Sequence, residues 1–279
     1  MQKPGPPRER SILELASMHW DKKRRNAFVA CYRIMRAVDD IVDNRRKRGM
    51  PIPRTERKAI ERTITDMIRK GAVFDPRSEC RELLVPSWPW RHWLRAMRYD
   101  LVKGCFPTYR AFLSYAEGAA VAPGAIFMHL CALRSGERLR SPRFNVRRAS
   151  RPLALFCYHV HILRDMKEDA RDGIVFVPDD MLREHGLDRE GFIGALRTRT
   201  LSESIRHIAR FYHDRGTEYR KASFAMLESI SAMVEERYRM SLKTLFDLYA
   251  EIHDRMDVAR GCFTADLLQR SRPDRKKKN

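Results

Sequence analysis

The sequence lacks the features that define several common classes of protein. Its six cysteines form no CxxC pair and have no zinc-ligand spacing. A 279-residue chain with 43% hydrophobic residues can form a core without a disulfide scaffold, so we expect reduced thiols in a cytoplasmic protein. Residues 1–10 are polar and proline-rich, unlike a secretory signal. No apolar run reaches the about 20 residues of a membrane span, so we expect any membrane contact to be peripheral.

Strand-like alternation is also nearly absent, apart from residues 174–177, and no internal repeat is present. Helical spacing dominates, which predicts an all-α protein. We expect a flexible N-terminus over residues 1–10, a helical domain over residues 11–265, and a basic, disordered tail over residues 266–279. The predicted helices cover residues 11–18, 21–44, 55–70, 91–103, 107–135, 150–169, 179–185, 201–219 and 222–262.

Charge of one sign is in excess. Lys and Arg number 56 and Asp and Glu number 36, which gives a net charge of +20. Such a surface attracts nucleic acid, an anionic membrane or a phosphorylated substrate, and the charge alone does not choose among them. Zinc-finger, RNP and helix-turn-helix patterns are missing, so we expect no specific nucleic-acid partner. We expect peripheral contact with an anionic membrane, although simple solvation of the helix faces also explains the basic runs.

The first informative segment is residues 31–43. On a helix, Tyr32, Arg36, Asp39 and Asp43 share one face, and the neighbouring positions are largely apolar. Two carboxylates one turn apart are suited to a hard cation such as Mg²⁺, with Mn²⁺ as an alternative, which completes its coordination with water and phosphate. Arg36 is placed to donate to a phosphate oxygen. A solvated acidic helix face is the simpler alternative.

The segment 156–169 repeats this chemistry. Tyr158, His161, Asp165 and Asp169 share a helix face, which Asp172 would join if the helix continued. Two such helices facing each other can bracket metal ions that bind a diphosphate and make it a good leaving group. An apolar cavity must then shield the resulting carbocation from water. Arg164 and Lys167 flank the carboxylates and are candidates to neutralise the diphosphate, and the candidate cavity walls are Phe28, Met35, Phe112, Met128 and Phe224.

From Ser11 to about Leu182 the sequence resembles the squalene/phytoene synthase family. The resemblance rests on two motifs, Tyr32-x-x-x-Arg36-x-x-Asp39-Asp40-x-x-Asp43 and Arg164-Asp165-x-x-x-Asp169, and on the segment 173–178 that follows the second. It implies a single-domain bundle of the isoprenoid synthase type with a central active-site cavity. It also implies magnesium bound by Asp39, Asp40, Asp43, Asp165 and Asp169, and the joining of two allylic prenyl diphosphates through a cyclopropyl intermediate.

The sequence departs from the family pattern at several positions. Tyr158 and His161 stand where the family usually has Gln and Asn, and both are candidates to contact the diphosphate. Glu117 replaces an aromatic residue thought to act on the cation or the proton, while Tyr115 lies two residues earlier; both are candidate catalytic residues. An early Ser-Phe pair becomes Ser11-Ile12, where Ser11 is a candidate diphosphate ligand.

The leading hypothesis is a magnesium-dependent prenyltransferase that condenses two farnesyl or geranylgeranyl diphosphates head to head. The product would be squalene, presqualene diphosphate, dehydrosqualene or phytoene, and NADPH is needed only for squalene. Two alternatives stay open, the first of them because of the departures at Tyr158, His161 and Glu117. One is ionisation of a single prenyl diphosphate followed by cyclisation or transfer to another acceptor. The other is a non-enzymatic helical assembly factor of the same fold. No pattern indicates the prenyl chain length or the oligomeric state.

Overall fold

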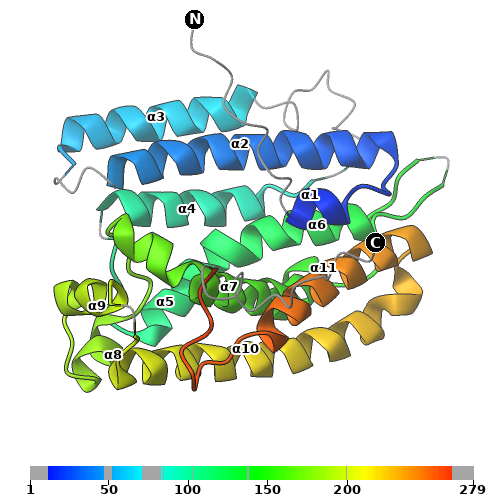
Figure 1. The fold of residues 1–279 in the computed structure, drawn as a ribbon. Coiled ribbons are helices and arrows are strands. Elements are labelled where there is room, and N and C mark those ends of the chain that lie inside the picture. Colours follow the sequence, from blue (N-terminus) through cyan, green and yellow to red (C-terminus); the bar gives the residue numbers. More distant parts are fainter. Residues whose placement is uncertain are drawn as a thin grey trace, which may run out of the picture.

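The computed structural model describes residues 12–46, 52–70, 83, 85–102, 104–136, 138–198 and 200–265 (Figure 1). The predicted termini, residues 1–10 and 266–279, and the candidate Ser11 lie outside these ranges. The elements in chain order are α1 (Ile12–Ala16), α2 (Lys22–Arg46), α3 (Arg54–Lys70), α4 (Trp88–Val102), α5 (Tyr109–Ala116), the π-helical segment η2 (Glu117–Val121), α6 (Ala122–Ala132), α7 (Val146–Arg171), α8 (Asp179–Glu184), α9 (Arg189–Leu196), α10 (Glu203–Ile230), the 3₁₀ turn η3 (Ser231–Met233) and α11 (Glu236–Asp254).

The prediction of an all-α fold is confirmed. Among the described residues there is no strand, and β-type pairing is limited to two isolated bridges, Arg134 with Arg140 and Asp257 with Cys262. The strand-like residues 174–177 form an extended connection instead. This connection is held to α10 by the Tyr212 hydroxyl, which donates to the carbonyl oxygen of Phe176 at 3.0 Å.

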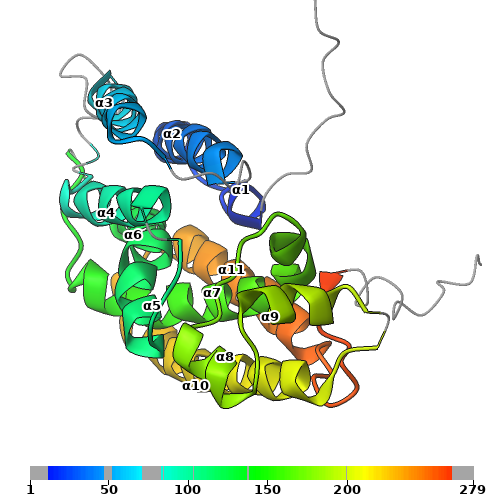
Figure 2. The same ribbon diagram turned by 90° about the vertical axis from the view of Figure 1, so that its left-hand side faces the viewer.

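Helix α7 is the centre of the bundle. It packs against α6, α10 and α11, and α2 packs on α4 and α6 with α3 covering it from outside (Figures 1 and 2). The start of α7 follows from local chemistry, because the Asn145 side chain accepts a hydrogen bond from the Arg148 N–H at 3.0 Å. The two predicted aspartate helices, residues 21–44 and 150–169, therefore exist as α2 and α7 and belong to one packed core.

The C-terminal helices differ from the prediction. Residues 222–262 were expected to form one helix, but α10 continues to Ile230, the chain turns at η3, and α11 ends at Asp254. The short helix α9 was not predicted. It begins because the Asp188 carboxylate caps the Gly191 N–H at 2.7 Å, a signal too local to stand out in a search for long apolar periodicity.

The stretch Tyr109–Ala132 is long and apolar enough to cross a membrane by length and composition. This differs from the expectation that no apolar run reaches that length. Within the bundle the stretch consists of α5, η2 and α6, and all residues from 125 to 132 are buried. Its packing against α4 and α7 identifies it as a core helix.

The helix widens at η2, inside the predicted helix 107–135. The Ala122 N–H bonds to the carbonyl oxygen of Glu117, five residues earlier, as in a π-helix. Gly118 packs directly on the backbone of α4, since a Cβ added to it would lie 2.3 Å from the carbonyl oxygen of His92. The absence of a side chain at Gly118 therefore allows α4 to approach the π-helical turn η2 closely.

Two stacked histidines join α10 to α11. The rings of His213 and His253 are 4.1 Å apart at an angle of 9°, and His253 is only 4% exposed. Burial, followed by the neighbouring His213, lowers the pKa of His253 from 6.5 to about 4. Protonation of His253 is therefore easier in the unfolded chain than in the folded one.

This packing predicts an acid-sensitive stability. A histidine whose folded pKa lies below its unfolded pKa stabilises the fold above pH 6.5, and this contribution is lost as the pH falls towards 4. We expect the free energy of unfolding of the wild-type protein to fall by about 2 kcal/mol more than that of His253→Phe between about pH 7 and pH 5. Urea denaturation at both pH values measures the difference. Parallel pH dependence of the two proteins would contradict the prediction.

Candidate active site

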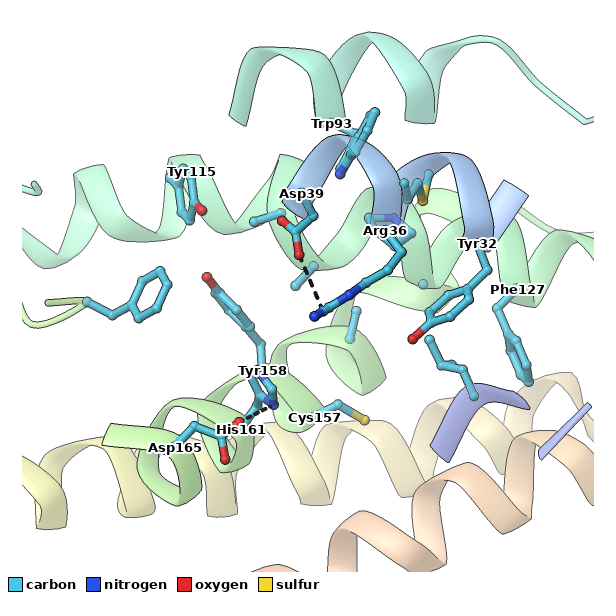
Figure 3. Close-up of a pocket in the computed structure, with 18 of the residues that line it drawn as sticks. Tyr32, Arg36, Asp39, Trp93, Tyr115, Phe127, Cys157, Tyr158, His161 and Asp165 are labelled. Atoms are coloured by element: carbon cyan, nitrogen blue, oxygen red, sulfur yellow. Dashed lines mark ion pairs between the residues drawn. The ribbon is translucent and has the colours of Figure 1, made fainter. Parts of the chain in front are cut away.

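A cavity of about 520 Å³ lies at the centre of the bundle, and both predicted aspartate helices line it (Figure 3). Helix α2 contributes one face, α7 the opposite face, and α4, η2, α6 and α11 close the sides. The acidic side chains of the lining come from three helices and from the residue after α7. They are Asp39, Asp43, Asp100, Asp165, Glu168, Asp169 and Asp172.

The polar residues of the first predicted motif lie on one face of α2, as their spacing required, and this face forms part of the cavity wall. Tyr32, Arg36, Asp39 and Asp43 all line the cavity. Arg36 lies between two carboxylates, with its Nη1 3.7 Å from Asp39 Oδ2 and its Nε 3.2 Å from Asp40 Oδ1. Asp40, a predicted metal ligand, is not among the lining residues. The arginine therefore connects the cavity-facing side of the motif to the side that faces away.

The carboxylate of Asp39 has an unusual titration. Burial, and then the negative charge of Asp43, raise the pKa of Asp39 from 3.8 to about 7, and Arg36 offsets this only in part. Asp100 on α4 adds to the repulsion. Negative charge is thus concentrated at this end of the cavity, and a cation bound there would relieve the repulsion.

The second stripe, on α7, also lines the cavity. Tyr158, His161, Asp165 and Asp169 belong to the wall, and Asp172 follows directly after the helix. Asp165 is paired with Arg164 in a bidentate arrangement, Nε to Oδ1 at 2.6 Å and Nη2 to Oδ2 at 2.7 Å. Burial acts to raise the pKa of Asp165, but the hydrogen bond from Arg164 and the charge of its guanidinium outweigh it and lower the pKa. The two motifs therefore differ, with Asp165 ionised and Asp39 prone to protonation.

The same arginine orients His161. Arg164 Nη2 lies 2.7 Å from His161 Nδ1, and His161 Nδ1 lies 3.1 Å from Asp165 Oδ2. Desolvation lowers the pKa of His161, and Asp165 offsets this only in part, so the ring is neutral at pH 7. Because Nη2 carries two hydrogens, it can donate both to the carboxylate and to Nδ1. We therefore assign the imidazole proton to Nε2, which makes His161 a hydrogen-bond donor to a ligand rather than a metal ligand.

Asp100 is a cavity residue that the sequence analysis missed. It is 6% exposed on α4, and its Oδ2 accepts a hydrogen bond of 2.8 Å from the hydroxyl of Tyr115, a predicted catalytic residue that lines the cavity as well. The available signal was a single aspartate on the apolar face of the helix at residues 88–102, where Trp93 and Met97 also face the core. Without the fold, nothing related this position to the two aspartate motifs.

Some predicted residues lie elsewhere. Glu117 is absent from the lining and forms ion pairs with Arg151, at 2.5 Å, and with Arg147, at 3.6 Å. Glu117 lies two residues after the cavity-lining Tyr115, about 200° around the helix, so its carboxylate faces the first turns of α7 instead of the cavity. The predicted diphosphate ligands Arg164 and Lys167 are also absent from the lining.

Only part of the predicted apolar wall is correct. Met35 and Met128 line the cavity. Phe28 and Phe112 are buried in neighbouring aromatic clusters, and Phe224 is 58% exposed on the outside of α10. Trp93, Met97, Phe127, Leu153 and Leu245 supply apolar wall that the sequence analysis did not identify.

The carboxylates fit a metal that is shared with a substrate. Within the described ranges, no group of three or more His, Cys, Asp or Glu side chains is arranged to hold a metal ion alone. Mg²⁺ commonly binds one or two carboxylates and takes its other ligands from water and substrate phosphate. Asp39 with Asp43, and Asp165 with Asp169, provide such sets on opposite walls, and the charges of Asp43 and Asp100 add to burial in raising the pKa of Asp39.

The fold and cavity place the protein in a structural class, the all-α bundles of the isoprenoid synthase type. Two solved structures share this architecture. One is a dehydrosqualene synthase in complex with ligand, with a TM-score of 0.66 and 15% identity over 92% of this chain and 89% of that chain. The other is the squalene synthase HpnC from Alicyclobacillus acidocaldarius, with a TM-score of 0.65 and 17% identity over 86% of each chain.

The model of the squalene/phytoene synthase family matches residues 10–275, and the chain belongs to this family. It is 27% identical over 203 residues to phytoene synthase 1, chloroplastic, of Zea mays, an alignment that covers 70% of this chain and 48% of the maize protein. Phytoene synthase of Cereibacter sphaeroides is 31% identical over 100 residues, which cover 36% of this chain and 26% of that protein. The alignments span about half the length of phytoene synthase 1 of Zea mays and of phytoene synthase 1 of Solanum lycopersicum, to which the chain is 26% identical over 210 residues. The family resemblance expected from the two motifs is thus confirmed.

Proposed function

We propose that the protein is a magnesium-dependent prenyltransferase that ionises prenyl diphosphates and condenses two of them head to head. One observation carries the proposal: two aspartate-bearing helices face each other across a cavity whose remaining wall is largely apolar. The names of the relatives, phytoene, dehydrosqualene and squalene synthases, support this reaction type. Farnesyl or geranylgeranyl diphosphate would be the substrate, and NADPH would be needed only for a reduced, squalene-type product.

Asp39, Asp43, Asp165 and Asp169 would hold the magnesium, which neutralises the leaving diphosphate when it is bound. The residues of the chain supply the rest. Arg36 extends from the first motif, where its guanidinium can donate to a phosphate oxygen of the substrate. His161, held by Arg164, presents the Nε2–H as a neutral donor. Both donors can bind the diphosphate without competing for the metal.

The prenyl cation must also be protected from water, and the apolar part of the cavity lining provides this protection. Met35, Met97, Phe127 and Leu245 are apolar parts of the lining and would shield the prenyl chain from water. Tyr115 adds a phenol to the lining, and its hydroxyl is fixed by the buried Asp100, which also acts on Asp39. A carboxylate–phenol pair in an apolar wall favours nearby positive charge, so this pair is suited to stabilising the cation.

A product assay tests the proposal. The purified protein is incubated with farnesyl or geranylgeranyl diphosphate and Mg²⁺, with and without NADPH, and the products are analysed by mass spectrometry. We expect hydrocarbons, or their cyclopropyl diphosphate precursors, with twice the carbon count of the substrate, and none after EDTA is added. Products with the carbon count of one substrate would exclude head-to-head condensation and favour cyclisation. Absence of diphosphate release with every substrate would favour a non-enzymatic role.

We also propose that the basic surface docks on anionic membrane, where prenyl substrates and products reside. The net charge of +20 supports this, since polybasic surfaces gain about 1 kcal/mol per Lys or Arg near such a membrane. We expect the protein to float with liposomes rich in phosphatidylglycerol at low salt and to be released at high salt. Equal behaviour with neutral and anionic liposomes would contradict this expectation.

A further inference from the structure

A second cavity, of about 420 Å³, lies far from the two aspartate motifs of α2 and α7. It is at the end of the bundle where α2 and α11 begin and the loop after α6 passes, on the right in Figure 1. At about 1.5 Å of rise per helical residue, its residue Arg24 is about 22 Å from Asp39 along α2. The two cavities share no lining residue, and Tyr238 packs on Trp20, which packs on Phe127 in the wall of the central cavity.

The cavity contains a buried arginine that is incompletely bonded. Arg24 is 1% exposed, and its Nε and Nη1 atoms are buried with no hydrogen-bond partner. Its Nε is 3.4 Å from Asp21 Oδ2, and its Nη2 is 3.4 Å from Ser135 Oγ and 3.8 Å from Glu235 Oε1. The guanidinium also stacks 4.0 Å above the ring of Tyr238. A buried cation with these long contacts retains capacity for a closer anionic partner.

The two carboxylates of the cavity are used to build its wall. Asp21 accepts a hydrogen bond of 2.5 Å from the Tyr238 hydroxyl, and its other oxygen caps the Arg24 N–H at 3.0 Å. Glu235 accepts from the Ser135 N–H at 2.8 Å. These bonds join α2, α11 and the loop after α6. Both carboxylates are therefore engaged in bonds between these segments and only partly neutralise the basic residues of the cavity.

Positive charge exceeds negative charge in this lining. Four basic residues, Lys23, Arg24, Arg138 and Arg237, face two acidic ones. Arg138 and Arg237 are exposed, and in the described part of the chain their side chains have no ion-pair partner. Planar guanidinium groups match the geometry of phosphate oxygens. The positive charge and the geometry of the guanidinium donors therefore favour an oxyanion as the ligand of this cavity.

We propose that this cavity is a second anion site, which binds a phosphate group either as free phosphate or as the headgroup of an acidic lipid. The surroundings are compatible with a lipid. Met18 and Met240, 41% and 54% exposed, lie three residues along the chain from Asp21 and Arg237. The site binds independently of magnesium, because its ligands are cationic side chains.

Inorganic phosphate provides the first test, by isothermal titration calorimetry of the full chain without Mg²⁺. We expect one site that weakens roughly tenfold or more in Arg138→Ala/Arg237→Ala, since two charge-assisted hydrogen bonds are lost. Arg239→Ala is the matched control, because Arg239 is an exposed arginine on α11 outside this lining. We expect it to bind like wild type. Both variant proteins should keep the prenyl diphosphate activity of the wild type.

Vesicles containing phosphatidic acid distinguish the two sources. If the ligand is a lipid headgroup, vesicle binding falls in the double variant but not in Arg239→Ala, and free phosphate binds weakly or not at all. If the ligand is free phosphate, the titration shows the loss and the vesicles do not. The proposal is overturned if neither probe separates the double variant from the control, since the anion would then bind elsewhere.

Discussion

The variant Asp39→Asn is expected to lose at least about 10³-fold in the rate of diphosphate release. A metal-binding carboxylate contributes several kcal/mol to stabilisation of the leaving group, and each about 1.4 kcal/mol corresponds to a tenfold change in rate. At the same time we expect the metal-free variant to be more stable than wild type at pH 8. The folded protein holds Asp39 with a pKa raised to about 7, so ionising this residue at pH 8 opposes folding. Asparagine removes that charge.

The measurements are diphosphate release from a prenyl substrate and thermal unfolding with and without Mg²⁺. Asp214→Asn is the control, since Asp214 is exposed on α10 and lies outside the central cavity. We expect it to behave like wild type in both assays. Activity of Asp39→Asn within tenfold of wild type would contradict the role of this carboxylate, whatever the stability. Lower activity with lower stability would indicate a structural role instead.

The second large effect is expected from Gly118→Ala. A Cβ at this position would lie 2.3 Å from the His92 carbonyl oxygen and 2.9 Å from the Ala96 Cβ, so α4 would have to move away from η2. Overpacking against a backbone atom cannot be relieved by a rotamer change. We expect the free energy of unfolding to fall by about 3 kcal/mol or more. Because Ala119 and Ala120 of η2 line the central cavity, activity should fall as well.

Gly194→Ala is the matched control for this substitution. Gly194 is inside α9, and a Cβ there would have no atom within 4 Å. Alanine has the higher helix propensity, so this variant should gain up to about 1 kcal/mol. Urea denaturation compares the three proteins. If Gly118→Ala unfolds within about 1 kcal/mol of wild type, the close approach of α4 is not needed for stability.

Much of the site was predictable because it depends on local periodicity. Tyr32, Arg36, Asp39 and Asp43 are spaced so that any helix places them on one face, and the apolar residues between them require the rest of the helix to be buried. The same argument applies to His161, Asp165 and Asp169 on α7. These residues line one cavity, as two facing polar stripes in an apolar bundle should.

Positions that depend on neighbouring helices were not predictable. Asp100 is a lone aspartate in its own segment, and only the packing of α4 beside η2 brings it to Tyr115. Glu117 was a candidate from its position in the sequence, but the packing of α7 beside η2 pairs it with Arg151 instead. Likewise, Arg164 and Asp165 are adjacent in sequence, but the packing of α7 decides that Asp165 faces the cavity and Arg164 supports it from behind.

The amino-acid sequence by itself determined the helical class, the two carboxylate stripes and the family, because each depends on spacing within a single helix of about 3.6 residues per turn. The tertiary structure decided which carboxylates share a cavity and how their pKa values differ. It also decided where the buried Arg24, near the start of α2, shares a cavity with three other basic residues. Those properties depend on distances between helices, and burial and Coulomb interactions change with such distances in ways that sequence spacing does not record.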